Sequence, residues 1–376
     1  MRIGLDAREA WREEPRGIGL YVRHLIREFG QGAADREFLL YHRSAATPGG
    51  LDLPPNMRPV RADMPGDRWH TWERVLMPWR MRRDRLDVYH GTYNTIPPSW
   101  RLWKGPPMVV TLHDTIVTWW PDDLGDPFVR YARAVTRRVV RDAAAILTVS
   151  EWSKKDICER FDCDPARVHI TWNGLHPDFL AGPPAGAAEV ARMRFAGGRP
   201  YLFGIGAPLA RKNTARLIEA FGVLASRKSC PHLLLLSGLS GHAQRFAEVA
   251  AAAGCAERVR FLPYLPRADL VALYAGADLS VYPSLVEGFG IPVLESLAVG
   301  TPVAASNTSA IPEAGGEHAS YFDPESTESM ASAIEAALYH RAEFDLVRDR
   351  AIERARGFTW ARTAQAVLKV YEKVAR

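Results

Sequence analysis

Two glutamates stand eight positions apart in the segment SLVEGFGIPVLESLAVG (residues 284–300), with a glycine–aromatic–glycine sequence between them. Gly288 and Gly290 allow a ligand to approach the backbone closely, because glycine has no side chain in the way. Pro292 is typical of the first turn of a helix, so the loop amides and the positive end of the helix dipole would meet a ligand there. Such a site suits a phosphate-bearing ligand.

The flanking carboxylates, Glu287 and Glu295, require partners other than phosphate. Carboxylates accept hydrogen bonds from hydroxyl groups, and a nucleotide sugar has hydroxyls on both sides of its phosphates. Glu287 is therefore a candidate for binding the sugar ring, and Glu295, expected in the first turn of the helix, for binding the ribose. The alternative is a surface glutamate and a first-turn acid that only stabilises a helix ending at Gly300.

A basic pair occupies a second loop. The segment FGIGAPLARKNTARLIEAF (residues 203–221) places Arg211 and Lys212 between a predicted strand and a helix that starts near Asn213. Two fixed cations there could balance the charge of a departing diphosphate without a metal ion. The alternative is a pair of cations that face only water. Leu209 replaces the third glycine of a dinucleotide fingerprint, so an NAD site is not predicted.

Both loops lie in a region where apolar strand segments alternate with helical ones. Buried parallel strands are predicted from apolar runs at 201–206, 232–238, 258–264, 279–284 and 302–306. The first half of the chain repeats the pattern less regularly, from MRIGL at its start to VHITWNG at 168–174. We therefore predict an α/β fold with two Rossmann-like, doubly wound domains, whose ligands bind at the carboxyl ends of the strands.

The predicted domain boundary lies in the stretch 173–200, which is rich in glycine, proline and alanine. Two domains suit a chain of 376 residues. We assign residues 1–175 to an N-terminal domain that binds the acceptor and residues 176–357 to a C-terminal domain that binds the donor. Residues 358–376 have the pattern of an amphipathic helix, which could pack on either domain.

The composition is that of an ordinary globular protein, with 47% hydrophobic and 24% charged residues. A net charge of +5 is too small to indicate a nucleic-acid-binding protein. Because no apolar run approaches the ~20 residues of a membrane-spanning helix and no signal peptide is visible, we expect a cytoplasmic protein. In that compartment free thiols are expected at Cys158, Cys163, Cys230 and Cys255.

Five motifs occur in the order in which one known family has them. They are RGIGLYVRHL (16–25), TVSEWSKKDI (148–157), WNGLHPDF (172–179), the RKN loop (211–213) and VEGFGIPVLESLAVGTPV (286–303). This set resembles the retaining glycosyltransferase family 4, which has the GT-B fold, over most of the chain. The opening segment is similar to members that build bacterial surface polysaccharides, often as mannosyltransferases.

The resemblance implies roles for the matching residues in the donor site. Arg211 and Lys212 would bind the donor diphosphate, Glu287 would contact the donor sugar, and Glu295 would bind the ribose hydroxyls. The backbone between the two glutamates would approach the sugar or the phosphates. On this reading the donor site also includes Gly288, Phe289, Gly290, Ile291 and Leu294.

The resemblance also implies roles for residues near the amino terminus. The loop around Gly17 and Gly19 would face the donor phosphate and the acceptor, and His113 would lie close to the anomeric carbon as a catalytic candidate beside Arg211, Lys212 and Glu287. Without the family, a histidine at the end of a strand is more often an ordinary hydrogen-bonded residue. In the family the C-terminal helix crosses back onto the N-terminal domain.

The implied reaction is the transfer of a hexose, with retention, from a nucleotide sugar to a glycan or lipid-linked saccharide, with GDP-mannose the favoured donor. No cofactor or metal is implied, and the D-x-D pair Asp162 and Asp164 is predicted to end a helix. The alternatives are a UDP-sugar donor, a GT-B epimerase acting on sugar nucleotides, and a non-catalytic protein that binds them. A phosphorylase is less favoured, because no motif indicates a lysine that carries pyridoxal phosphate.

A basic segment rich in tryptophan, residues 67–86, raises the question of membrane contact. It contains Trp69, Trp72 and Trp79 among six arginines, a composition found in helices that lie on anionic bilayers. The alternative, slightly favoured, is an ordinary helix with tryptophans in the core and arginines in water, interrupted at Pro78.

Overall fold

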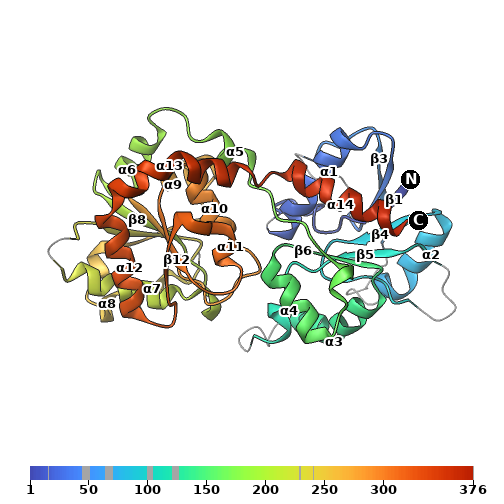
Figure 1. Cartoon of the computed structure of the whole chain (residues 1–376), viewed down its shortest axis with the longest axis horizontal. Coiled ribbons are helices and arrows are strands. Elements are labelled where there is room, and N and C mark those ends of the chain that lie inside the picture. Colours follow the sequence, from blue (N-terminus) through green and yellow to red (C-terminus); the bar gives the residue numbers. More distant parts are fainter. Residues whose placement is uncertain are drawn as a thin grey trace. The chain divides into compact units, whose positions relative to one another are not determined.

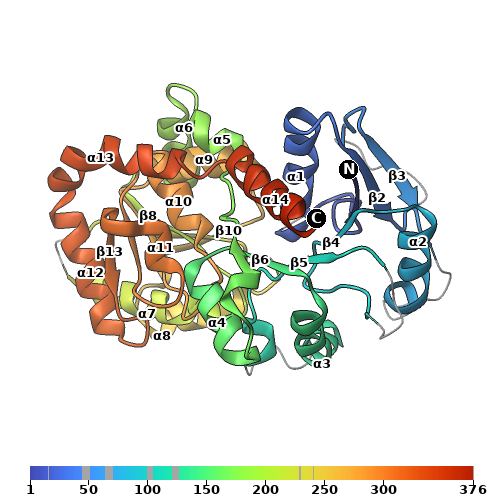
Figure 2. The same cartoon turned by 45° about the vertical axis from the view of Figure 1, so that its right-hand side comes forward.

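The computed structural model of the chain describes residues 1–15, 17–44, 51–63, 71–99, 105–120, 127–227, 230–239 and 241–375. They form two compact units, shown in Figure 1 and Figure 2. The N-terminal unit comprises Met1–Gly174 and Thr359–Arg376, and the C-terminal unit comprises Leu175–Phe358. The chain therefore leaves the first unit once and returns to it for its last helix.

The N-terminal unit is built on a seven-stranded sheet whose neighbouring strands are all parallel. In sheet order the strands are β3 (Met57–Arg61), β2 (Glu37–His42), β1 (Arg2–Asp6), β4 (Val88–Gly91), β5 (Met108–Thr111), β6 (Ala145–Thr148) and β7 (Val168–Ile170). Its α-helices are α1 (Ile18–Gly32), α2 (Met77–Arg83), α3 (Pro127–Asp142), α4 (Glu151–Phe161) and α14 (Trp360–Val374). Strands β5 and β6 read MVVT and AILT and are buried throughout, because both of their faces are covered.

The C-terminal unit contains a six-stranded sheet, again with parallel neighbours only. In sheet order the strands are β10 (Val259–Leu262), β9 (Leu233–Ser237), β8 (Tyr201–Ile205), β11 (Leu279–Tyr282), β12 (Val303–Ser306) and β13 (Ala319–Phe322). Its helices are α5 (Pro177–Ala181), α6 (Ala187–Ala196), α7 (Thr214–Ala225), α8 (Ala243–Ala252), α9 (Arg267–Gly276), α10 (Ile291–Ala298), α11 (Ile311–Gly315), α12 (Thr327–Tyr339) and α13 (Arg341–Arg356). Alternating strands and helices thus give two Rossmann-like domains, which confirms the predicted fold class.

Two strands were not predicted, and both lie at the edge of a sheet. β3 reads MRPVR, with two exposed arginines, and β13 reads ASYF, with one buried residue. An edge strand can do with few buried side chains, and these two lack the apolar run by which the other strands are recognised.

The strand order reverses once in each sheet, and ligands of such sheets bind outside the carboxyl ends of the strands at that reversal. In the N-terminal unit the reversal lies between β1 and β4, and in the C-terminal unit between β8 and β11. The loop with the basic pair follows β8, and the glycine loop follows β11. The fold therefore brings the two predicted halves of the donor site to one edge of one sheet.

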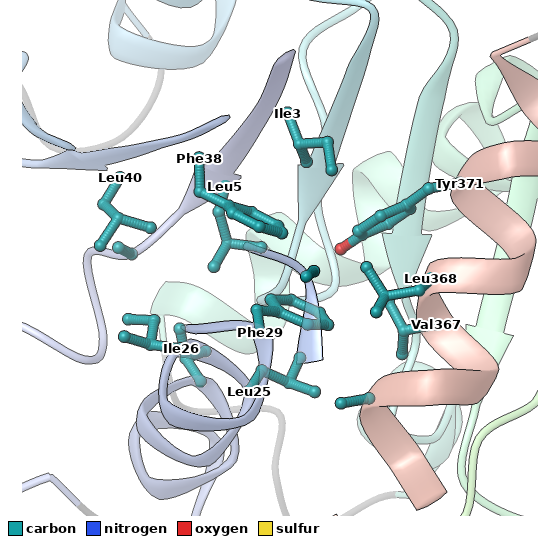
Figure 3. Packing of buried hydrophobic residues seen from close by; sticks show 14 of the residues in the cluster. Ile3, Leu5, Leu25, Ile26, Phe29, Phe38, Leu40, Val367, Leu368 and Tyr371 are labelled. Carbon is teal, nitrogen blue, oxygen red and sulfur yellow. The ribbon is translucent and has the colours of Figure 1, made fainter. Parts of the chain in front are cut away.

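Helix α14 completes the core of the N-terminal unit. Val367 and Tyr371 on α14 belong to the same buried cluster as Leu25 and Phe29 of α1, and Figure 3 shows these side chains facing one another. The hydroxyl of Tyr371 lies 2.5 Å from Nδ1 of the buried His90 on β4. The return of the C-terminal helix to the N-terminal domain, which the resemblance implied, is confirmed.

We expect Tyr371→Phe to destabilise the protein by about 1–3 kcal/mol, because it removes the hydroxyl that pairs with a buried ring nitrogen. Burial lowers the pKa of His90 to about 3, so the ring is neutral at pH 7. Because the ring is fully buried, water cannot replace the lost hydrogen bond. Glu372→Ala on the same helix is the control, since it breaks only an exposed pair with Arg36 and should cost less than about 1 kcal/mol. Urea unfolding measures both, and equal losses would contradict the role of the Tyr371 hydroxyl.

Candidate active site

The loop after β8 holds the basic pair in a fixed backbone. Arg211 and Lys212 lie in a short 3-10 turn, and Asn213 follows in the left-handed conformation with φ 57° and precedes α7. The Asn213 amide donates hydrogen bonds to the carbonyl oxygens of Pro283, at 3.1 Å, and Pro324, at 2.7 Å. An asparagine adopts this conformation more readily than most residues. The basic loop is thereby tied to the loop after β11.

The two cations converge on one carboxylate. Nζ of Lys212 lies 2.5 Å from Oε1 of Glu287, and Nη1 of Arg211 lies 3.3 Å from Oε2. Burial alone would raise the pKa of Glu287, but the charges of Lys212 and Arg211 outweigh it and lower the pKa below 4.5. Glu287 is therefore ionised at neutral pH, and its pairing contributes stability that is lost only as the pH falls through this lowered pKa.

The cluster of Arg211, Lys212 and Glu287 retains one positive charge, since two cations face a single carboxylate. Nε of Arg211 is buried and has no hydrogen-bond partner among the described residues. No described residue thus uses this part of the guanidinium's hydrogen-bonding capacity. The cluster can accept an anion that offers more than one oxygen.

The glycine loop leads directly into α10. Gly290 has φ 151°, a conformation that other residues rarely adopt, and a Cβ at this position would lie 3.1 Å from Cβ of Ala314. Pro292 occupies the first turn of α10, as predicted. Glu295 is the fifth residue of α10 and lies in its second turn, so its expected place in the first turn was wrong. The turn at 287–290 delays the start of the helix to Ile291.

The other loop residues differ in what they can offer a ligand. The ring of Phe289 is buried with its centroid 5.7 Å from that of Phe358, so only its backbone could reach a donor. Leu294 is completely buried, and its amide donates to the carbonyl of Gly290 at 3.4 Å. Ile291 is half-buried. The amide of Glu287 donates to Oγ of Ser309 at 2.9 Å, which fixes the start of the loop.

Glu295 has an environment unlike that of Glu287. It is only 8% exposed, and its partners are the buried Tyr274 hydroxyl and the guanidinium of Arg267, whose Nη1 lies 3.8 Å from Oε1. Burial raises the pKa of Glu295 to about 7, against which the Arg267 charge and the Tyr274 hydrogen bond act only in part. Both partners come from α9, and neither was predicted from the sequence.

The raised pKa of Glu295 makes a prediction for stability. The unfolded carboxyl titrates near 4.5, so the contribution of this group is fully present below that pH and is lost as the pH rises through 7. We expect Glu295→Gln to stabilise the protein at pH 8 by about 3–4 kcal/mol, since each unit of pKa difference is worth about 1.4 kcal/mol. At pH 5 the gain should be small. Urea unfolding at the two pH values measures it, and a gain that does not depend on pH would contradict the assigned pKa.

In the N-terminal unit, the predicted glycines lie where α1 begins. Gly17 precedes α1 with φ 47°, in the left-handed region. A Cβ on Gly19 would lie 2.7 Å from the carbonyl oxygen of Glu9, so the first turn of α1 can approach the preceding loop only with glycine there. Because Gly17 and Gly19 have no side chains, a ligand could approach the backbone closely at the start of α1.

His113 follows β5 at the carboxyl edge of the same sheet. Its Nε2 lies 3.2 Å from the carbonyl oxygen of Thr92, and its amide donates to Oδ1 of Asn94 at 3.0 Å. Burial lowers the pKa of His113 to about 4, so the ring is neutral at pH 7. Because a carbonyl can only accept, Nε2 carries the proton and Nδ1 is an acceptor. Tyr21 contacts the ring edge-on with centroids 4.8 Å apart.

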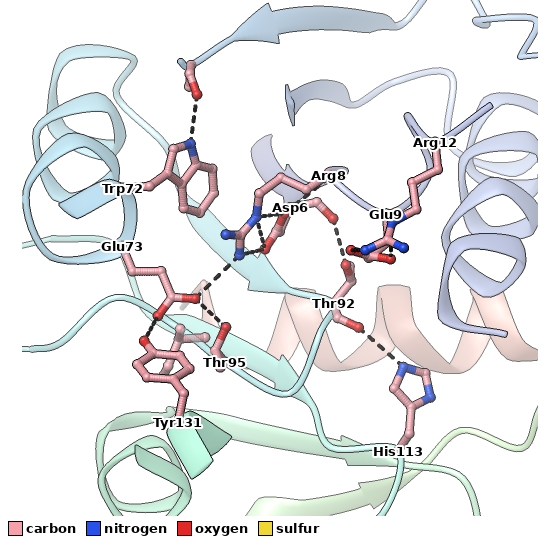
Figure 4. A network of polar contacts seen from close by, with 12 residues as sticks. Asp6, Arg8, Glu9, Arg12, Trp72, Glu73, Thr92, Thr95, His113 and Tyr131 are labelled. Atoms are coloured by element: carbon pink, nitrogen blue, oxygen red, sulfur yellow. Dashed lines mark hydrogen bonds and ion pairs between the residues drawn. The ribbon is translucent and has the colours of Figure 1, made fainter. Parts of the chain in front are cut away.

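A buried ionic network beside β1 was not predicted (Figure 4). The guanidinium of Arg8 lies 2.7 Å from the Asp6 carboxylate and 3.3 Å from that of Glu73, and it stacks 3.8 Å above the Trp72 ring. The Tyr131 hydroxyl donates to Glu73 at 2.6 Å. Nothing in the sequence indicated this network, because its residues are far apart in the chain. The tripeptide Asp6–Arg8 at the end of the first strand also belongs to no recognisable motif. The network ties the end of β1 to the segment around Trp72 and to α3.

The prediction of a helix in the basic tryptophan segment can be compared with the structure only from residue 71 on. Arg68 and Trp69 lie outside the described residues. Residues Trp72–Leu76 form a π-helical turn that continues into α2, so Pro78 stands in the first turn of α2 and does not break a longer helix. Trp72 is fully buried, whereas Trp79 is 52% exposed. One tryptophan is thus in the core and the other on the surface.

The D-x-D pair has the structural role that the sequence predicted. Asp162 follows α4 in the left-handed conformation, and the Asp164 side chain accepts a hydrogen bond from the amide of Ala166 in the next turn. Within the described ranges, no group of three or more histidine, cysteine or acidic side chains is placed to hold a metal ion. Across the same ranges, none of the helices has both the length and the apolar character needed to cross a bilayer.

Comparison with known protein families identifies the family to which the chain belongs. Residues 15–179 match the model of Glycosyltransferase Family 4, and residues 188–358 match that of Glycosyl transferases group 1. The chain is a glycosyltransferase of the GT-B fold. The second match contains Arg211, Lys212, Glu287 and Glu295, and the first contains Gly17, Gly19 and His113.

This glycosyltransferase has relatives that act on different saccharides. It is 29% identical over 304 residues to O-antigen chain mannosyltransferase B of Escherichia coli, which covers 80% of this chain and 78% of the relative. It is 27% identical over 283 residues to a D-inositol 3-phosphate glycosyltransferase of Corynebacterium glutamicum, covering 72% and 67% of the two chains. Among solved structures, Anabaena Alr3699/HepE in complex with UDP and glucose has a TM-score of 0.73 at 16% identity, covering 99% and 100%.

Proposed function

We propose that this glycosyltransferase transfers a hexose, with retention of configuration, from a nucleotide sugar to a glycan or lipid-linked saccharide acceptor. The observation that carries the proposal is the cluster of Arg211, Lys212 and Glu287 at the strand-order reversal of the C-terminal sheet. It combines two cations for a diphosphate with a carboxylate for sugar hydroxyls. We propose it as the donor site, together with the glycine loop and Glu295.

In this mechanism the chain stabilises charge and positions the reactants. Arg211 and Lys212 neutralise the diphosphate as the glycosidic bond breaks, and the amides at the start of α10 add to that stabilisation. Glu287, released from the cations as phosphate oxygens replace it, accepts hydrogen bonds from the sugar. The acceptor hydroxyl attacks from the face that the phosphate leaves, and a phosphate oxygen takes its proton. His113 offers Nδ1 to a substrate hydroxyl.

For the donor we propose GDP-mannose, with a UDP-sugar as the second candidate. The first is supported by the similarity to an O-antigen chain mannosyltransferase, and the second by the fold shared with a protein whose structure holds UDP and glucose. A sugar-nucleotide epimerase on the same fold is the alternative reaction. It would release a sugar product in the absence of any acceptor.

A thermal-shift panel of GDP-mannose, UDP-glucose, UDP-galactose, UDP-GlcNAc, GDP and UDP tests the donor site. A ligand at about 100 times its dissociation constant should stabilise the protein by about 2.7 kcal/mol. A shift by one donor, followed by NMR assignment of the product's anomeric configuration, would support retaining transfer. No shift with any nucleotide, or an inverted product, would overturn the proposal. Unchanged turnover in EDTA is expected, because two side-chain cations serve the diphosphate.

We further propose that the enzyme works in the cytoplasm and contacts the inner face of the membrane through the N-terminal unit. Exposed Trp79 carries the guanidinium groups of Arg80 and Arg83 over its ring, at 5.4 and 5.0 Å, and Val75 nearby is 58% exposed. Basic and aromatic side chains of this kind bind anionic headgroups. Co-sedimentation with anionic vesicles at low salt tests this, and Trp79→Ser should weaken it. Absence of binding by the unaltered protein would refute membrane contact.

A further inference from the structure

Arg267 lies between the buried Glu295 carboxylate and the protein surface. It is the first residue of α9, and its side chain is 30% exposed, whereas the Glu295 side chain is 11% exposed. On the inner side, the Tyr274 hydroxyl bonds the same carboxylate, and Tyr274 is itself fixed by the Phe203 ring at 4.8 Å. A guanidinium at the rim and a phenol in the core therefore hold Glu295 between them.

The separation of Arg267 from Glu295 indicates how the pair acts. At 3.8 Å, Nη1 and Oε1 attract by charge but are too far apart for a hydrogen bond. Arg267 thus makes no hydrogen bond to Oε1 that a ligand hydroxyl would have to replace. Among the described elements packed against α10, the groups that act on the titration of Glu295 are Arg267 and Tyr274, both on α9. Only Arg267 brings a positive charge.

A positive charge is needed beside Glu295, because burial favours the protonated carboxyl and the proposed function requires the carboxylate. A buried carboxyl with a pKa near 7 is about half protonated at neutral pH. A protonated carboxyl loses acceptor capacity, whereas a carboxylate can accept charge-assisted hydrogen bonds from two neighbouring ribose hydroxyls. Whatever keeps Glu295 ionised therefore controls how tightly the nucleotide binds.

We propose that Arg267 is a positioning residue of the donor site, which favours the ionised form of Glu295 without taking up a hydrogen-bonding position on the carboxylate, so that Glu295 can accept a hydroxyl of the nucleoside diphosphate. This inference rests on the proposed function, in which Glu295 binds the ribose. Arg267 acts through Glu295, so its effect on binding depends on pH. Loss of a direct contact between Arg267 and the nucleotide would instead weaken binding at every pH.

Isothermal titration calorimetry with GDP and UDP, from pH 6 to 9, tests the inference in the full chain. We expect Arg267→Met to bind the nucleotide about fivefold more weakly than the unaltered protein at pH 7 and about equally at pH 9, since a rise of about one unit in the pKa of Glu295 lowers the ionised fraction at pH 7 from about one half to about one tenth. Arg267→Lys, which retains the charge, should bind within about threefold of the unaltered protein at pH 7. Thermal unfolding verifies that each variant is folded.

Arg194→Met is the matched control. Arg194 of α6 pairs with Asp269 of α9 at 3.1 Å, so it also docks on α9, but it is no partner of Glu295. Its loss should leave binding unchanged. A constant loss across pH in Arg267→Met, or no loss, would overturn the role of Arg267 while the donor site stands. If neither GDP nor UDP binds the unaltered protein at any pH, the proposed function fails, and the inference fails with it.

Discussion

Arg211→Ala lowers kcat/KM for sugar transfer by about 10²–10³, the cost of removing one group that stabilises developing negative charge in an enzyme. The expected size follows from the position of Arg211. Its guanidinium and the Lys212 ammonium both pair with Glu287, and its buried Nε has no hydrogen-bond partner among the described residues. Because the charge on the leaving diphosphate grows in the transition state, kcat should fall more than KM rises. Initial rates over a range of donor concentrations separate the two constants.

Arg245→Ala serves as the control for that experiment. Arg245 is an exposed arginine of α8 in the same unit, stacked 5.4 Å above the Phe246 ring, and it makes no contribution to the donor site as proposed. Its loss should change kcat/KM less than twofold. If Arg211→Ala retains near-normal turnover while remaining folded, stabilisation of the diphosphate by this residue is ruled out.

Glu287→Gln is expected to separate diphosphate binding from sugar transfer. The Glu287 carboxylate pairs with both cations, so a diphosphate that binds these cations must displace it. The neutral amide competes poorly for cations, and we expect the nucleoside diphosphate to bind about three- to tenfold more tightly, a gain of about 0.7–1.4 kcal/mol. Transfer should nevertheless fall by about 10² or more, because the group that receives the sugar hydroxyls has lost its charge.

Calorimetry with GDP and UDP and a product assay measure these two effects on the same preparation. The combination is diagnostic, because a variant that is merely damaged would lose binding as well as transfer. Weaker binding of both nucleotides to Glu287→Gln would contradict the view that the carboxylate holds the place of the phosphates. Glu317→Gln, an exposed glutamate paired only loosely with His318 at 3.9 Å, is a suitable control.

Much of the fold could be predicted from the sequence, because the central parallel strands are recognisable as apolar runs. YLFGI and LLLLS became β8 and β9, and the segment around Asn213 became the start of α7. The edge strand β3 could not be predicted, since MRPVR buries little and contains a proline. β3 is therefore defined by its pairing with β2 more than by its own residues.

The proposed donor site shows a similar division between what the sequence predicts and what it does not. Loops that follow buried strands in a parallel sheet meet at one edge, so the approach of Arg211 and Lys212 to Glu287 was a consequence of correct strand assignment. Arg267 could not be found in this way, because it meets Glu295 through the packing of α9 on α10, which no spacing in the sequence encodes. Nor does the sequence disclose that Glu287 pairs with both cations.

The place of α14 in the N-terminal core has a consequence for how the protein is made. A ribosome finishes Met1–Gly174 and then the whole C-terminal unit before it reaches α14, at roughly 5–20 residues per second. For about ten seconds or more, the surface formed by Leu25, Phe29 and His90 lacks the side chains that cover it in the finished molecule. The nascent N-terminal unit is therefore a natural client for chaperones, and a chain terminated before residue 360 would keep that apolar surface exposed permanently.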